Sequence, residues 1–240
     1  MSELEAMESQ ARDANVSVLM GYNKNVCKYV SRVREFASSN PSGHVTFVSN
    51  NTYEDTPESL GECFERNKEG MLKNMAIHEL ALLVSFYNIS VSSIASVSVD
   101  RTFSSMQTLK GPSGSNFTDF DKVKFTVTTL TGSKVSVQAD RCGGNVSYAT
   151  VTDEAGDELF RYSMPDEEDQ ANVERLKDKY PNAMDYFFTQ DKDYIALKDR
   201  VAAFAAGKTD EAEGVASIKV AVDTLKLAEH LEVVIKKDLA

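Results

Sequence analysis

Several residue types and sequence patterns that identify common protein classes are scarce or absent in this chain. It contains no tryptophan, five prolines and three cysteines in 240 residues. The cysteines, Cys27, Cys63 and Cys142, are odd in number and far apart, and they include no C-x-x-C pair. This spacing argues against a disulfide framework and predicts reduced, buried thiols.

Histidine is equally scarce. His44, His78 and His230 lack the close spacing of zinc ligands, so no structural metal is predicted. His78 lies in an apolar stretch and is typical of a satisfied core histidine. His44 begins a predicted strand, and His230 lies among charged helical positions.

A long hydrophobic run is also missing. The most apolar stretch, 71–87, is interrupted by Lys73, Asn74, His78 and Glu79, and it is too short and too polar to span a bilayer. The chain starts with acidic and polar residues, without the basic start and apolar run of a secretory signal. These features predict a soluble, cytoplasmic protein without membrane contact.

Sequence motifs for catalysis are weak or absent. The loop 111–115 resembles a phosphate-binding loop but lacks the Gly-Lys-Ser/Thr and the helix that a P-loop requires. In 141–144 an arginine adjoins a thiol, which would lower the thiol pKa, although Gly-Gly favours a hairpin turn. Asp119 and Asp121 could serve as metal ligands or as acid and base, although a loop that caps the next strand is favoured. The sequence therefore predicts no enzyme, no cofactor and no metal.

What the chain does have is enough apolar residues for a packed core. Apolar residues make up 42%, with 12 phenylalanines and 9 tyrosines. At this length, folding buries about 70% of the extended-chain surface or more. No long polar linker interrupts the sequence, so residues 1–240 are predicted to form a single α+β domain.

Periodicity divides this predicted domain into three parts. Residues 1–88 are mainly helical, with an apolar stripe over 22–37, a short strand at 44–48 and a buried helix over 71–87. Thr56-Pro57 marks a helix start, because threonine can cap and proline fits the first turn.

The middle part, about 89–164, alternates with a period of two and predicts a central antiparallel β-meander with one buried face. Hairpins are expected around 131–133 and around 153–157. Helices return over 165–240. The last segment, 215–239, mixes strand-like and helical periods, and its length and composition favour a helix.

The charge of the chain is concentrated at one end. Residues 151–240 carry 21 acidic and 12 basic residues, a net of −9, whereas residues 1–150 carry 16 against 14. A field of one sign attracts basic partners and repels nucleic acid. The predicted partner-binding acids are Asp153, Glu154, Asp157, Glu158, Asp166, Glu167, Glu168 and Asp169.

These observations favour a non-enzymatic protein–protein interaction protein whose acidic C-terminal surface engages a basic partner. Such a surface would inhibit a nucleic-acid-handling enzyme by occupying its nucleic-acid site, as a viral accessory protein does, without binding nucleic acid directly. One alternative is a structural or assembly subunit that self-associates, and another is an enzyme with a dispersed carboxylate site. Surplus apolar positions in 215–239 predict a homodimer, and simple solubility remains an alternative explanation for the acids.

Overall fold

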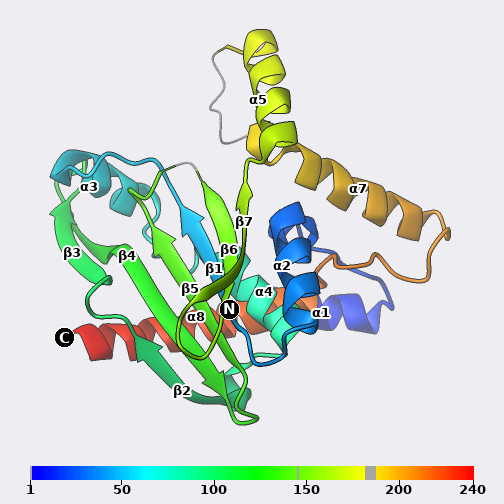
Figure 1. Ribbon diagram of the computed structural model, residues 1–240, viewed down its shortest axis with the longest axis horizontal. Helices are drawn as coiled ribbons and strands as arrows, with labels where there is room; N and C mark the ends of the chain where they lie inside the picture. Colours follow the sequence, from blue (N-terminus) through cyan, green and yellow to red (C-terminus); the bar gives the residue numbers. More distant parts are fainter. Residues whose placement is uncertain (1, 145, 182–187) are drawn as a thin grey trace.

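The computed structural model describes residues 2–144, 146–181 and 188–240, in which α-helices flank a mixed β-sheet (Figure 1). The helices are α1 (Ser2–Asp13), η1 (Asn23–Val26), α2 (Lys28–Ser38), α3 (Pro57–Arg66), α4 (Ile77–Tyr87), η2 (Val91–Ser93), α5 (Glu167–Lys179), α7 (Asp191–Ala205) and α8 (Ile218–Leu239). The strands are β1 (His44–Asn50), β2 (Ile94–Val99), β3 (Ser105–Lys110), β4 (Asn116–Thr129), β5 (Lys134–Asp140), β6 (Ser147–Thr152) and β7 (Glu158–Met164). The predicted α+β class is confirmed.

The sheet is mixed, and the predicted antiparallel meander is wrong at its centre. The strand order is β2-β4-β5-β1-β6-β7, with β3 also paired to β4. β1 comes from the N-terminal part of the chain and lies between β5 and β6, parallel to the first and antiparallel to the second. Its consecutive buried residues, Phe47, Val48 and Ser49, fit a strand covered on both faces. Both predicted hairpins, β4/β5 and β6/β7, are present.

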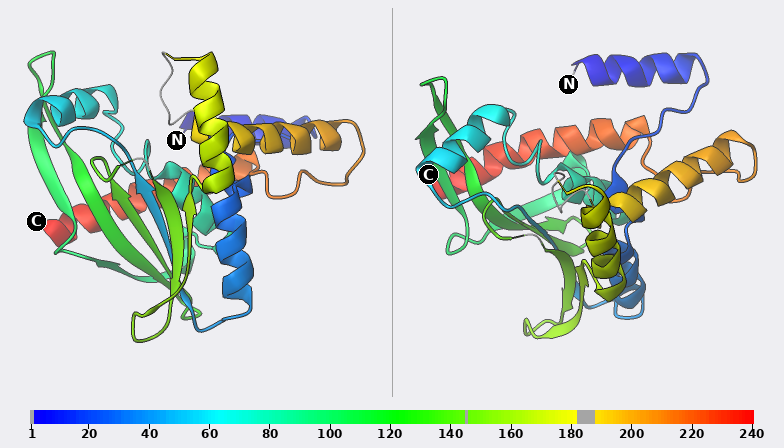
Figure 2. Two further views of the ribbon diagram at one scale, coloured as in Figure 1. Left: turned by 45° about the horizontal axis from the view of Figure 1, so that its top comes forward. Right: turned by 90° about the horizontal axis from the view of Figure 1, so that it is seen from above.

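One face of the sheet carries the hydrophobic core. α2, α4 and α8 pack on this face, and α1 lies alongside α8 (Figures 1 and 2). The side chains of Phe125 and Val127 in β4 and of Val135 and Val137 in β5 point into it. Successive strand residues point to opposite faces, so the intervening residues of β4, such as Lys124, are only partly buried.

Local sequence features explain where the two central core helices, α4 and α8, begin and where α4 ends. α4 starts at Ile77, because Met71 to Ala76 form turns after Gly70, whose φ is +91°. It ends at Asn88, which has a φ of +52°, a left-handed conformation common at helix C-termini. α8 begins where the Ser217 side chain caps it, which confirms a helix in this segment.

The apolar faces of α8 are covered within the chain by α4 and α1. The homodimer and the single-domain assignment stay predictions. In the described residues, no helix is long and apolar enough to span a membrane.

Asp119 and Asp121 lie within β4, so the predicted capping loop is wrong. Asp119 is 4% exposed, and its carboxylate accepts a hydrogen bond from the guanidinium of Arg141 at 2.6 Å. Arg141 is itself fully buried and also donates to Cys63 Sγ at 3.0 Å. Residues 141–144 form a turn but no hairpin, because β5 and β6 are separated by β1.

Candidate functional site

A short 3₁₀ turn places three polar side chains inside the protein. Asn23, Lys24 and Asn25 of η1 have exposed fractions of 1%, 7% and 5%. Lysine and asparagine are seldom buried unless they have polar partners. Asn25 Nδ2 donates to Ser85 Oγ of α4 at 2.9 Å, which ties η1 to that helix.

Lys24 connects η1 to both α4 and β1. Its ammonium donates to Ser49 Oγ at 3.1 Å and pairs with the Glu79 carboxylate, which is fully buried. An ammonium group has three donors, so these two contacts leave one N–H of Lys24 for a further acceptor. The second oxygen of Glu79 has no hydrogen-bond partner among the described residues.

His78 lies one residue before Glu79 on α4 and is not the satisfied core histidine that the sequence predicts. Its Nδ1 is buried and has no hydrogen-bond partner in the described part of the chain. The Tyr22 ring meets the imidazole edge-on, with 5.7 Å between ring centroids. Burial, reinforced by the positive charge of Lys24, lowers the pKa of His78 to about 4. The imidazole is therefore neutral at pH 7 and can accept a proton.

Lys24 and His78 line the same cavity, whose volume is about 180 Å³. Its walls come from the end of β1, the start of β6, the turn before α4 and the residue before α7. The other lining residues are Ser49, Asn50, Asn51, Asn74, Met75, Ser147 and Gln190. Side-chain amides dominate this wall, and each amide offers both donors and acceptors.

A second, smaller cavity of about 30 Å³ shares Lys24, Asn50, Ser147 and Gln190 with the first and therefore lies next to it. Asp193 of α7 forms part of its wall. Burial, together with the nearby negative charge of Asp169, raises the pKa of Asp193 to about 7. The cavity pair thus contains two titratable groups whose environments disfavour their charged forms, which is typical of functional sites.

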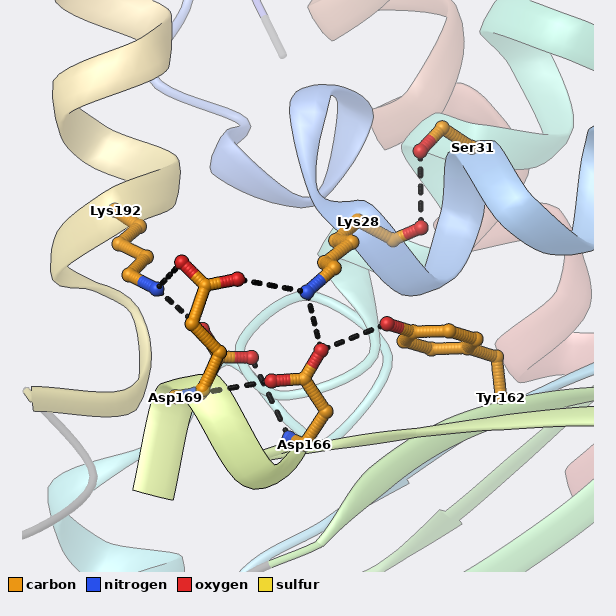
Figure 3. Close-up of polar contacts among 7 residues, drawn as sticks. Lys28, Ser31, Tyr162, Asp166, Asp169 and Lys192 are labelled. Atoms are coloured by element: carbon orange, nitrogen blue, oxygen red, sulfur yellow. Dashed lines mark hydrogen bonds and ion pairs between the residues drawn. The ribbon is translucent and has the colours of Figure 1, made fainter. Parts of the chain in front are cut away.

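A polar cluster joins α2, α5, α7 and β7 (Figure 3), and its member Lys192 directly precedes Asp193 in α7. Asp166 caps α5 by accepting from Asp169 N, and its other oxygen accepts from Lys28 Nζ and from the Tyr162 hydroxyl. Lys192 of α7 pairs with Asp169 at 3.2 Å. The cluster fixes the position of α5 and α7 and therefore of Asp193.

The predicted partner-binding acids fall into two groups at opposite ends of β7. This strand has 7 residues and rises about 3.3 Å per residue, so its ends are about 20 Å apart. In the first group, Asp153 Oδ1 accepts from two backbone N–H groups of its turn, and Glu158 pairs with Arg161 at 2.8 Å. Glu154 and Asp157 are exposed on the same hairpin.

In the second group, Asp166, Glu168 and Asp169 belong to the cluster of Figure 3, and Glu167 is exposed in the first turn of α5. These acids are therefore not brought into one face. Their role in partner binding stays a prediction.

The sequence reading missed most of the cavity. The apolar residues around His78 predict a core position, and no sequence pattern indicates a role for the amides. One usable signal was the pair Asn50-Asn51, which directly follows a buried strand. Another was the triplet 23–25, because two asparagines and a lysine interrupt an otherwise apolar stripe. In the described residues, no group of three or more His, Cys, Asp or Glu side chains is placed to hold a metal ion.

No family model and no curated protein matches the chain, but solved structures do. A putative myo-inositol dehydrogenase from Sinorhizobium meliloti has a TM-score of 0.63 at 14% identity, over 95% of this chain and 66% of that one. The WlbA dehydrogenase from Bordetella pertussis, solved with NADH and UDP-GlcNAcA, has a TM-score of 0.56 at 12% identity over 94% and 64%. A super-repressor mutant of Gal80p from Saccharomyces cerevisiae has a TM-score of 0.52 at 16% identity over 98% and 66%.

The chain thus spans just under two thirds of the length of these structures. At these identities the likeness establishes the fold, which is shared by proteins named dehydrogenases and by a repressor. The predicted non-enzymatic protein–protein interaction, with its viral accessory and inhibitor role, is wrong, because the fold is that of named dehydrogenases. The prediction that the chain is not part of an enzyme is corrected by the same finding.

The residues of this chain do not fit a nicotinamide dinucleotide. The sequence contains no G-x-G-x-x-G fingerprint, whose glycines allow the pyrophosphate to approach a helix N-terminus. In the described part, the parallel pairing is restricted to β1 and β5, and the helix after β1 starts at Thr56-Pro57 rather than at a glycine turn.

Proposed function

We propose that this chain is the substrate-binding part of a dehydrogenase-type oxidoreductase that acts on a small polyhydroxylated molecule. The observation that carries the proposal is that two groups line the same amide-lined cavity. They are the neutral imidazole of His78 and the ammonium group of Lys24, which has one N–H left for a further acceptor. The likeness to dehydrogenases adds support at the level of fold. Because a fold does not determine a function, the proposal depends on the cavity.

Each residue has a role that follows from its chemistry. Oxidation of an alcohol to a carbonyl transfers a hydride from carbon to an acceptor, here a phenazine supplied in solution, and releases the hydroxyl proton to a base. His78 lines the cavity and would accept that proton as a general base. The remaining N–H of Lys24 would donate to the same substrate oxygen and stabilise the negative charge that develops there. Glu79 and Ser49 act as positioning residues, because they hold the ammonium group against the cavity wall.

The amides would orient the ring of the substrate. A hydroxyl group both donates and accepts a hydrogen bond. The side-chain amides of Asn50, Asn74 and Gln190 already have one partner each, namely Val146 O, Glu69 and Asn23, but an amide has two donors and two acceptor lone pairs, so each keeps capacity for a ligand. A site built to bind hydroxyl groups rejects analogues that lack them, because its polar groups are then left unpaired. The cavity is therefore expected to prefer polyols to apolar molecules of the same size.

The test is a comparison of His78→Gln with the matched variant His230→Gln, which makes the same change on α8 outside the cavity. Binding of myo-inositol and D-glucose to the full chain is measured by calorimetry. Turnover is measured with a phenazine acceptor supplied in solution. We expect His78→Gln to keep affinity within about threefold and to lose roughly 10² to 10⁴ in kcat, as for removal of a general base.

The pH profile gives an independent readout. Protonation of His78 removes the base, so kcat/KM should fall as the pH drops through about 4 rather than near 6.5. Circular dichroism at each pH establishes that the chain is folded. The proposal fails if no polyol binds at about 100 mM, a concentration at which even sites far weaker than 1 mM are occupied, or if both histidine variants behave alike.

A further inference from the structure

The cavity wall is nearly free of uncompensated positive charge. Among its described lining residues, Lys24 is charged at pH 7, and Asp193, whose pKa is raised to about 7, is partly ionised there and mostly ionised at pH 8. The ammonium group of Lys24 is paired with the fully buried Glu79 carboxylate. The remaining N–H of Lys24 can donate to a ligand oxygen, but its positive charge is already offset by Glu79, so a phosphate or carboxylate of a ligand would find no uncompensated counter-charge there. Drawing Lys24 away from Glu79 would leave that carboxylate buried and unpaired, which is strongly unfavourable.

The lysines beside the wall are also engaged. Lys28, Lys73 and Lys192 are each adjacent in the chain to a lining residue. Lys28 pairs with Asp166, and Lys192 with Asp169 at 3.2 Å. Lys73 pairs with Glu232 at 3.1 Å. Residues 145 and 182–187 contain no lysine or arginine in the sequence.

The inner end of the site is acidic rather than basic. Asp193 lines the smaller cavity, and the buried Asp169 lies close enough to influence it. In the cluster of Figure 3, Asp166 and Asp169 are paired with Lys28 and Lys192. An anionic ligand group in the smaller cavity would meet the Asp193 carboxylate, which is 9% exposed, and juxtaposed like charges are unfavourable.

The size of the cavity also limits the ligand. At about 180 Å³ it is smaller than the roughly 300–1,000 Å³ of pockets for drug-sized molecules. It therefore suits a single small ring, with hydroxyl groups facing the amides of Asn50, Asn74 and Gln190.

From the ion pair, the acidic inner wall and the amide lining, we infer that the site selects an uncharged polyhydroxylated ring and rejects phosphorylated, carboxylated and nucleotide-linked sugars. This inference rests on the proposed function and narrows it. It separates the chain from a dehydrogenase solved with UDP-GlcNAcA, whose ligand carries a diphosphate.

The test uses two ligand pairs whose members differ in charge; the amide and the carboxylate of the first pair also match closely in shape. Affinities of the full chain for D-glucuronamide and D-glucuronate, and for 6-O-methyl-D-glucose and D-glucose 6-phosphate, are measured by calorimetry at pH 8. The neutral member of each pair should bind at least about tenfold more tightly, equivalent to about 1.4 kcal/mol. Equal or tighter binding of the charged members would overturn the inference while leaving the proposed function intact. If neither neutral nor charged sugars bind, the proposed function itself fails.

Two variants test the cause of the selectivity. Glu79→Gln frees the charge of Lys24 and should reduce the preference for glucuronamide about tenfold or more, because the released ammonium can pair with the ligand. Asp193→Asn, which keeps Lys24 paired, should reduce the same preference through lost repulsion. Asp178→Asn on the exposed surface of α5 serves as the matched control. An unchanged preference in Asp193→Asn, with the variant folded by circular dichroism, contradicts the electrostatic origin.

Discussion

Lys24 of η1 and Glu79 of α4 form an ion pair in which neither side chain is more than 9% exposed. The residues are 55 positions apart, so the pair joins two segments that are independent in the sequence. Burying two charges is costly, and their attraction offsets this only when the geometry is good and the remaining polar atoms are satisfied. One Glu79 oxygen lacks a hydrogen-bond partner in the described residues, so the pair is better explained by function than by stability.

Breaking this pair from one side should destabilise the fold. Lys24→Met leaves the Glu79 carboxylate buried and uncompensated, at an expected cost of about 3–5 kcal/mol in the free energy of unfolding. The double variant Lys24→Met, Glu79→Leu should recover much of that loss while abolishing polyol binding. Urea melts provide the measurement. The exposed pair of Arg32 and Glu35 is the control, with an expected effect below about 1 kcal/mol.

The core helix α4 should be sensitive to cavities. Leu80 and Leu83 are fully buried between the sheet and α8. Replacing either leucine by alanine should lower the free energy of unfolding by about 2–5 kcal/mol, through lost burial and the space left behind. Val233→Ala on α8, where the side chain is 69% exposed, should change it by less than about 0.5 kcal/mol. A leucine effect below about 1 kcal/mol would show that α4 is peripheral.

Local features of the fold were accessible from the sequence because their causes are local. Thr56 caps α3 and Pro57 occupies its first turn, as the sequence predicts. The alternation of apolar and polar residues around Gly132 predicts the β4/β5 hairpin. The position of β1 was not accessible in this way. Its insertion between β5 and β6 depends on pairing between distant segments, and no nearby residue encodes that order.

The candidate site was missed for the same reason. Its residues lie on η1, β1, the turn before α4, β6 and the segment before α7. His78 reads as a core residue, because the spacing around it is apolar, and only the fold shows that its side of α4 faces a cavity. The acids, by contrast, stood out in the sequence, yet capping and ion pairing account for several of them, including Asp153 and Asp166.

Asp166 should contribute to stability at neutral pH through its three contacts. Burial alone would raise its pKa, but hydrogen bonds from Lys28, the backbone of Asp169 and Tyr162 lower the pKa well below its usual range. A depressed pKa gives stability that is present above the unfolded value of about 4 and is lost as the pH falls further. Asp166→Asn keeps an N-cap acceptor but loses the charge that pairs with Lys28. It should therefore cost about 1 kcal/mol or less at pH 7, as for a partly exposed ion pair, and less at pH 3. Glu174→Gln, on the exposed side of α5, is the comparison in urea melts at both pH values.

Asp193, in contrast to Asp166, should lower the free energy of unfolding at neutral pH. Its folded pKa of about 7 lies above the unfolded value of about 3.9 for aspartate, so the folded state binds the proton more tightly. The cost of burying its charge is absent below about pH 4, develops between 4 and 7, and is complete above 7. Asp169 on α5 adds to this cost, and Lys24 on η1 reduces it.

Asp193→Asn removes the charge, so the variant should gain stability relative to wild type between pH 5 and pH 8, with an upper figure of roughly 4 kcal/mol for a shift of this size. Urea melts of both proteins at the two pH values measure the gain. A difference between variant and wild type that does not change with pH would show that Asp193 titrates normally and that the inner wall of the cavity is not electrostatically strained.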